Sequence, residues 1–150
     1  MAIVWTQDLN TGIEVIDIQH RMIVDYINQL EAAVKQRDRV AVGGVLVDLT
    51  DYTLSHFAFE ESLQEDAGYM FAKPHKSVHE VFAKRIARYQ ERHNGGDNIA
   101  EELHAMLVSW LIDHIKRDDM AYVSAVKGSM LKVIAEKDKS GTGWIKRFFK

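Results

Sequence analysis

Two pairs of potential metal ligands stand four residues apart in the middle of the sequence: His56 with Glu60, and His75 with His79. Four residues along an α-helix amount to about 400° of rotation and about 6 Å of rise, so both side chains of a pair point in the same direction. Each pair can therefore face one metal centre. The fold must bring the two helices together and add ligands from other parts of the chain. The remaining candidates are His20, His114 and Asp119.

Composition restricts the kind of metal and the kind of protein. The 150-residue chain has no cysteine, which excludes disulfides, zinc-thiolate sites and iron–sulfur clusters, so nitrogen and oxygen must hold any metal. The formal net charge of -3 and the 27% of charged residues are ordinary for a soluble globular protein and indicate no nucleic-acid partner. Because neither a signal-peptide pattern nor an apolar run of about 18 residues is present, we expect a cytoplasmic protein.

Apolar residues recur at intervals of three and four in four segments, which predicts four amphipathic helices. The first two are expected at about residues 18–36, with Asp17 as N-cap, and 40–65. The third is expected to carry Pro74 in its first turn, and the fourth follows a turn that ends in the cap residue Asp97. Short connections predict an all-α, antiparallel up-down four-helix bundle with an extended N-terminal arm. We expect one domain, residues 1–136, whose helical period continues past Asp119, and a C-terminal tail, residues 137–150.

The proposed ligands lie on the helix faces that otherwise carry apolar residues. A single histidine on such a face is more often a hydrogen-bonded core residue, but burying seven polar side chains together without a metal would leave many of them unsatisfied. Imidazole and carboxylate ligands suit iron, zinc, copper or manganese, and two carboxylates among five imidazoles suggest two bridged octahedral ions. With Glu60 and Asp119 as bridges and a bridging oxo or hydroxo, roughly eleven of twelve positions are filled. One position would remain for a small ligand such as dioxygen.

Other metal frameworks fit the sequence less well. A ferritin-like di-iron site needs two Glu-x-x-His motifs, and only Glu101 and His104 have that spacing. The His-Glu-x-x-His helix of zinc proteases is absent, because no second histidine follows His79-Glu80 at the required place. A phosphate-binding glycine loop is absent as well.

The spacing of His114 and Asp119 does not fit a regular α-helix. Five residues correspond to about 140° of rotation, so the two side chains would point apart. A local widening of the helix, as in a π-bulge, would bring them together, and so would a rotated Asp119 side chain. Asp118, four residues from His114, is the competing ligand.

Four segments of the sequence together resemble the ligand signature of hemerythrins, in particular the single-domain bacteriohemerythrins. They are residues 17–20, 56–61, 75–79 and 114–119, and the resemblance extends over about residues 4–126. It implies that His75, His79 and His114 bind one iron, that His20 and His56 bind a second, and that Glu60 and Asp119 bridge them. It also implies an apolar oxygen pocket formed by Ile23, Trp110, Leu111 and Ile115.

The resemblance implies reversible dioxygen binding at a di-iron centre with a bridging oxo or hydroxo, in an oxygen carrier rather than an enzyme. The alternatives are a di-iron enzyme that acts on peroxide, nitric oxide or oxygen, and a sensor. His93 and His104 match no ligand position and are interpreted as surface or helix-face residues. Nothing in the sequence indicates self-association, and we expect a monomer.

The end of the chain has a composition of its own. From Glu136 to Lys150, five basic residues oppose two acidic ones, and four large apolar residues lie between them. This pattern is typical of a segment that docks on a membrane surface or on a partner, such as an oxygen-consuming protein. The alternative is a short helix folded back on the bundle. The apolar residues are Trp144, Ile145, Phe148 and Phe149.

Overall fold

The computed structural model describes residues 2–139, with side chains as far as residue 129. The helices are α1 (Glu14–Lys35), α2 (Arg39–Asp66), α3 (Ala72–Asn94), α4 (Ala100–His114) and α5 (Met120–Lys139), and a π-helix (Ile115–Asp119) joins the last two. A short 3₁₀-helix (Gln7–Leu9) lies in the N-terminal arm. Residues 2–139 contain no strand. Residues 140–150, which make up most of the expected tail, lie outside the described residues.

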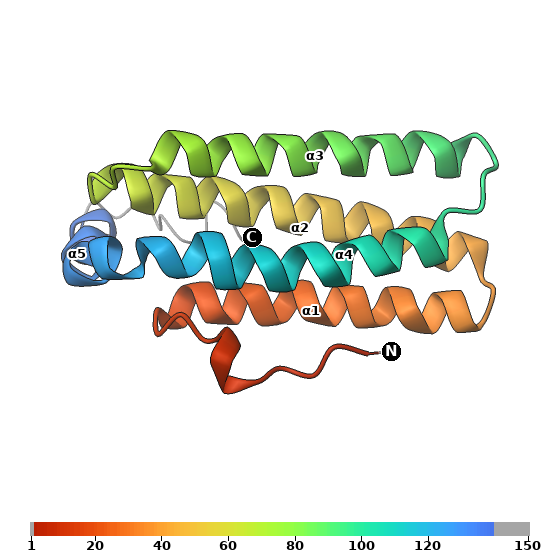
Figure 1. Ribbon diagram of the computed structural model, residues 1–150, viewed down its shortest axis with the longest axis horizontal. Coiled ribbons are helices and arrows are strands. Elements are labelled where there is room, and N and C mark those ends of the chain that lie inside the picture. Colours follow the sequence, from red (N-terminus) through yellow and green to blue (C-terminus); the bar gives the residue numbers. More distant parts are fainter. Residues whose placement is uncertain (1, 140–150) are drawn as a thin grey trace.

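Helices α1 to α4 run side by side along the long axis of the molecule, as Figure 1 shows. Helix α1 packs against α2 and α4, and α2 packs against α3. The chain changes direction after α4, so that α5 lies at one end of the bundle, where it contacts α2. The predicted antiparallel four-helix bundle is therefore confirmed. No described helix is long and apolar enough to span a lipid bilayer.

The beginnings of two helices differ from the prediction, because the expected cap residues have other partners. Helix α1 begins at Glu14, so Asp17 lies in its first turn. The Asp17 carboxylate accepts hydrogen bonds from the backbone N–H groups of Thr11 and Gly12, which ties the arm to the bundle. Helix α4 begins after Ile99, and Asp97 accepts a hydrogen bond from Arg92 Nε instead.

The buried apolar side chains form two clusters, and the predicted ligands lie where the two meet. Along α2, for example, Leu49 and Phe57 belong to the larger cluster, and Phe59 and Leu63 belong to the smaller one. His56 and Glu60 occupy the same stretch of this helix. The smaller cluster lies at the α5 end and consists of Ile13, Ile16, Phe59, Leu63, Tyr122 and Val126.

Candidate metal centre

The bundle brings all seven predicted ligands to one buried place. Helix α1 contributes one of them, and α2 and α3 contribute two each. The last residue of α4 and the last residue of the π-helix supply the other two. Each of the seven residues is at most 5% exposed. They are His20, His56, Glu60, His75, His79, His114 and Asp119.

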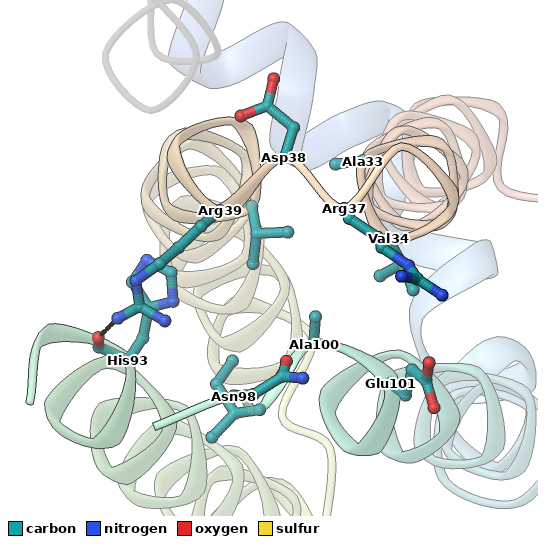
Figure 2. A pocket seen from close by; sticks show the side chains of 11 residues that line it. Ala33, Val34, Arg37, Asp38, Arg39, His93, Asn98, Ala100 and Glu101 are labelled. Atoms are coloured by element: carbon teal, nitrogen blue, oxygen red, sulfur yellow. Dashed lines mark hydrogen bonds between the residues drawn. The ribbon is translucent and has the colours of Figure 1, made fainter. Parts of the chain in front are cut away.

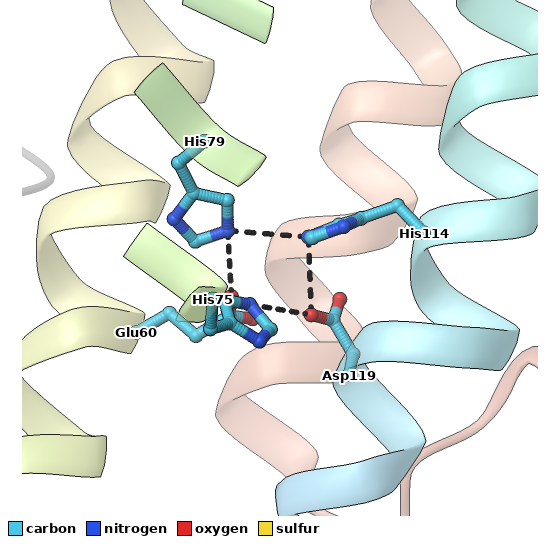
Figure 3. Close-up of side chains that lie close together, drawn as sticks. All are labelled: Glu60, His75, His79, His114 and Asp119. Carbon is cyan, nitrogen blue, oxygen red and sulfur yellow. Dashed lines mark hydrogen bonds and ion pairs between the residues drawn. The ribbon is translucent and has the colours of Figure 1, made fainter. Parts of the chain in front are cut away.

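The seven side chains form two groups that share both carboxylates. Within each group, one potential ligand atom from every residue lies within 4.8 Å of the others. The first group contains three histidines, His75, His79 and His114, and Figure 3 shows them around the two carboxylates. The second contains His20 and His56. Glu60 and Asp119 belong to both groups.

Glu60 turns one carboxylate oxygen toward each group. Its Oε1 lies 2.7 Å from Nε2 of His75 and 3.1 Å from Nε2 of His79. Its Oε2 lies 3.5 Å from Nε2 of His56 and accepts a hydrogen bond of 2.9 Å from the hydroxyl of Tyr122. The buried Tyr122 thus helps to hold the carboxylate with one oxygen toward each group.

Asp119 is oriented in the same way. Its Oδ1 lies 3.2 Å from Nε2 of both His75 and His114, and its Oδ2 lies 3.0 Å from Nε2 of His20. The π-helix makes this possible, since its wider turn brings Asp119 to the side of the helix that carries His114. The predicted widening is confirmed. Asp118 lies outside the cluster and contacts the outer nitrogen, Nδ1, of His114 at 2.8 Å.

Three of the five imidazoles are fixed through their outer nitrogen. Besides the Asp118 contact, Nδ1 of His56 lies 2.7 Å from Oε1 of Gln19, and Nδ1 of His79 lies 2.8 Å from Oε2 of Glu61. Because these oxygens accept hydrogen bonds, each Nδ1 carries the proton and Nε2 presents a lone pair to the centre. The orienting roles of Gln19, Glu61 and Asp118 were not predicted from the sequence. Glu61 and Asp118 could have been noticed as acidic residues adjacent to, or one helical turn from, a ligand.

The donor set fits cations. The Nε2 atoms of His79 and His114 lie 3.1 Å apart, and with both Nδ1 atoms protonated their lone pairs face each other. The buried nitrogens of His20 and both oxygens of Asp119 have no hydrogen bond of acceptable geometry within residues 2–129. Lone pairs converging in a buried site repel one another unless protons or metal ions lie between them.

In the metal-free chain, protons on some of the histidines reduce this repulsion between lone pairs, and the pKa values show which side chains carry a charge. Burial lowers the pKa of His56 to about 3, so this ring is neutral. Burial also opposes the charged form of His75, but its contacts with Asp119 and Glu60 outweigh it and raise the pKa to about 10. In His114, burial is outweighed by the charge of Asp119, and the pKa rises to about 8. Burial raises the pKa of both carboxyl groups, but the surrounding histidines lower it further, so both are ionised.

A small cavity lies against the histidines. It has about 10 Å³ of space, roughly what one water molecule needs. Of the four residues expected in an oxygen pocket, Ile23, Trp110 and Leu111 line this cavity, whereas Ile115 is fully buried and is not among the lining residues. Helical spacing from the candidate ligands, in either direction along the chain, could have identified most of the other lining residues. They are His20, Ile27, Leu49, Thr53, His56, Phe57, Phe82, Leu107 and His114.

A larger cavity of about 460 Å³ lies at the other end of the bundle, between the α1–α2 and α3–α4 connections, and is shown in Figure 2. It contains none of the seven ligands. Arg39 reaches across to the backbone oxygens of His93 and Asp97, so it serves to join these two connections. His93 lies at this cavity, and His104 lies 3.6 Å from Glu31, so both are away from the metal centre as expected.

Comparison with known proteins places the chain in a family. The family model described as "Hemerythrin HHE cation binding domain" matches residues 11–126. The bacteriohemerythrin of Pseudomonas aeruginosa (strain LESB58) is 49% identical over 148 residues, which cover 99% of this chain and 95% of the relative. That of Stenotrophomonas maltophilia (strain R551-3) is 50% identical, with coverage of 98% and 97%. A crystal structure of wild-type hemerythrin, 26% identical, matches 84% of this chain and 98% of its own with a TM-score of 0.80. The chain belongs to the hemerythrin family.

Proposed function

We propose that this protein binds dioxygen reversibly at two non-haem iron ions and serves as an oxygen carrier, store or delivery protein. The observation that carries the proposal is the arrangement of two ligand groups around two shared carboxylates, next to a cavity of molecular size. Family membership supports it, since reversible oxygen binding is what the resemblance to hemerythrins implies.

Each residue has a role in the proposed centre. His75, His79 and His114 would hold one iron, and His20 and His56 would hold the other. Glu60 and Asp119 would each offer one carboxylate oxygen to each ion, consistent with the division of their oxygens between the groups. The reduced iron pair would supply the electrons that dioxygen takes up on binding and returns on release.

The protein's own contribution is orientation and exclusion of water. Gln19, Glu61 and Asp118 fix the imidazoles, which favours tight metal binding. Leu111 and Ile23 form apolar walls of the cavity and keep water and protons away from the bound gas. A cavity of about 10 Å³ has no space for an organic substrate, which favours a small gas over a larger reactant.

Anaerobic reconstitution tests the proposal. The metal-free protein is loaded with ferrous iron, iron is counted per chain, and optical spectra are recorded through cycles of air and degassing. We expect two irons per chain and a charge-transfer band that appears in air and fades on degassing. His20→Gln should bind less iron, whereas His104→Gln, outside the centre, should behave as the wild type. If the iron is oxidised once in air and the ferrous spectrum does not reappear on degassing, this would contradict oxygen carriage and favour a di-iron enzyme or a sensor.

A further inference from the structure

Among the described residues that line the small cavity, Thr53 contributes the only hydroxyl group. It lies on α2, one turn before His56, and is 3% exposed. Its Oγ1 atom has no hydrogen-bond partner within residues 2–129. Because buried hydroxyl groups in proteins are nearly always hydrogen-bonded, the missing partner of Thr53 requires an explanation.

A neighbouring threonine shows which backbone acceptor the helix makes available to a threonine hydroxyl group. Thr50, on the same helix, donates a hydrogen bond of 2.7 Å from its hydroxyl to the backbone oxygen of Leu46. This bond to the residue four positions earlier is the ordinary one for a helical threonine. The corresponding acceptor for Thr53 is the backbone oxygen of Leu49, and Thr53 does not use it. The hydroxyl of Thr53 is therefore free to bond a molecule inside the cavity.

The cavity has the volume for one such molecule. About 10 Å³ is roughly the space that a single water molecule requires, and buried waters need at least two polar partners. Thr53 supplies one partner. The second lies on the side of the candidate metal centre, where His20, His56 and His114 line the same cavity. The other walls are apolar or aromatic.

We propose that the Thr53 hydroxyl holds one water molecule in the ligand cavity, and that a diatomic ligand must displace this water in order to bind. The site would accept molecules of one or two heavy atoms that carry a lone pair. When the ligand leaves, water that re-enters beside Thr53 is the nearest proton donor to the departing ligand in otherwise apolar surroundings. The displacement of this water by a ligand rests on the proposed oxygen-binding function, whereas the presence of the water does not.

The metal-free protein tests the water site directly. Thr53→Val removes the hydroxyl at nearly constant volume, Thr53→Ser keeps it, and Thr50→Val is the matched control. Crystals at high resolution should show electron density for one water beside residue 53 in the wild type and in Thr53→Ser, but not in Thr53→Val. The melting temperature of Thr53→Val should equal or exceed that of the wild type, since no intramolecular bond is lost, whereas Thr50→Val should melt lower.

The iron-loaded protein tests the effect on the ligand. Irreversible oxidation in air should be slower in Thr53→Val by about tenfold, the factor that one hydrogen bond contributes, and near the wild-type rate in Thr53→Ser. A dry cavity in the wild type, a melting temperature lowered as in Thr50→Val, or an unchanged or faster oxidation rate in Thr53→Val would overturn the inference. If the wild type binds no oxygen reversibly, the proposed function fails, whereas the crystal and melting data still decide the water site.

Discussion

The orientation of a candidate ligand histidine depends on the contact that its outer nitrogen makes. An imidazole without such a contact can rotate about its bonds, and its two nitrogens can exchange the proton. Gln19 prevents this in His56, because its side-chain oxygen accepts from Nδ1 at 2.7 Å in a buried position. The residue next to a ligand in the sequence thus orients a ligand on a different helix.

Replacing Gln19 by Leu should weaken iron binding. The variant leaves Nδ1 of His56 without an acceptor and frees the ring, so the affinity should fall by about 10- to 100-fold. Titration of the metal-free protein with ferrous iron measures this. Gln29→Leu, the same exchange at an exposed position of α1, is the control. An equal affinity in both variants would show that the Gln19 contact does not orient the ligand.

A polar residue at Leu111 should hasten irreversible oxidation. Leu111 is 4% exposed and lines the cavity, so Leu111→Asn would admit water and stabilise the charge separation that accompanies oxidation. The rate of loss of the oxygenated spectrum in air measures the effect. Leu54→Asn, at a side chain that is 45% exposed, should leave the rate unchanged. An unaltered rate in Leu111→Asn would argue against this wall of the pocket.

At the scale of the element, α2 shows how a helix is both started and placed. The Asp38 side chain accepts from the backbone N–H of Ala41 and caps the first turn. Two glycines follow inside the helix, where glycine is unfavourable relative to alanine. They are not equivalent, because only Gly43 lies against another element. A Cβ atom on Gly43 would lie 2.8 Å from Nε2 of His93 on α3, whereas one on Gly44 would meet nothing within 4 Å.

Gly44→Ala should therefore stabilise the protein, by about 0.5–1 kcal/mol. Gly43→Ala gains the same helix propensity but must displace the His93 ring, so its net gain should be smaller or negative. Urea unfolding of the two variants and the wild type measures the free energies. Equal stabilisation in both variants would mean that the His93 side chain moves away without cost.

At the scale of the whole molecule, the candidate metal centre lowers the folding stability of the chain when no metal is bound. Seven buried polar side chains stand where two apolar clusters meet, and the metal-free chain can keep them there only by holding protons on some of the histidines. Metal ions would take the place of these protons, so metal binding and folding stability are linked through pH.

The stability of the metal-free protein should be greatest near pH 6.5. Between pH 3 and 6.5 the unfolded chain binds a proton at His56 that the folded chain does not, so stability rises with pH. Above 6.5 the folded chain retains protons on His114 up to about pH 8 and on His75 up to about pH 10. Stability therefore falls with rising pH, by at most about 1.4 kcal/mol per pH unit for each proton. Urea unfolding of the metal-free protein across this pH range measures the free energy of unfolding. A flat profile above pH 6.5 would contradict the raised pKa values of His114 and His75.

Much of the fold and of the cluster could be predicted because the signals are periodic. Spacings of three and four marked the helices, and the same spacing placed His56 with Glu60 and His75 with His79. The two predicted N-caps were wrong because other donors bind these carboxylates in place of the N–H groups of the helix. Asp17 accepts from the backbone of the arm, and Asp97 accepts from Arg92. The orienting contacts of Gln19 and Glu61 join different helices and therefore left no periodic signal.

The sequence by itself determined the four-helix architecture, placed the candidate ligands on apolar helix faces and showed that a regular α-helix would turn His114 and Asp119 apart. These follow from rotation per residue along a single helix, which is a local property. Only the tertiary structure decided which carboxylate oxygen faces which histidines, that Asp118 lies outside the cluster, and that Thr53 has no partner. Those outcomes depend on distances between side chains of different helices, and such distances are set by how the helices pack.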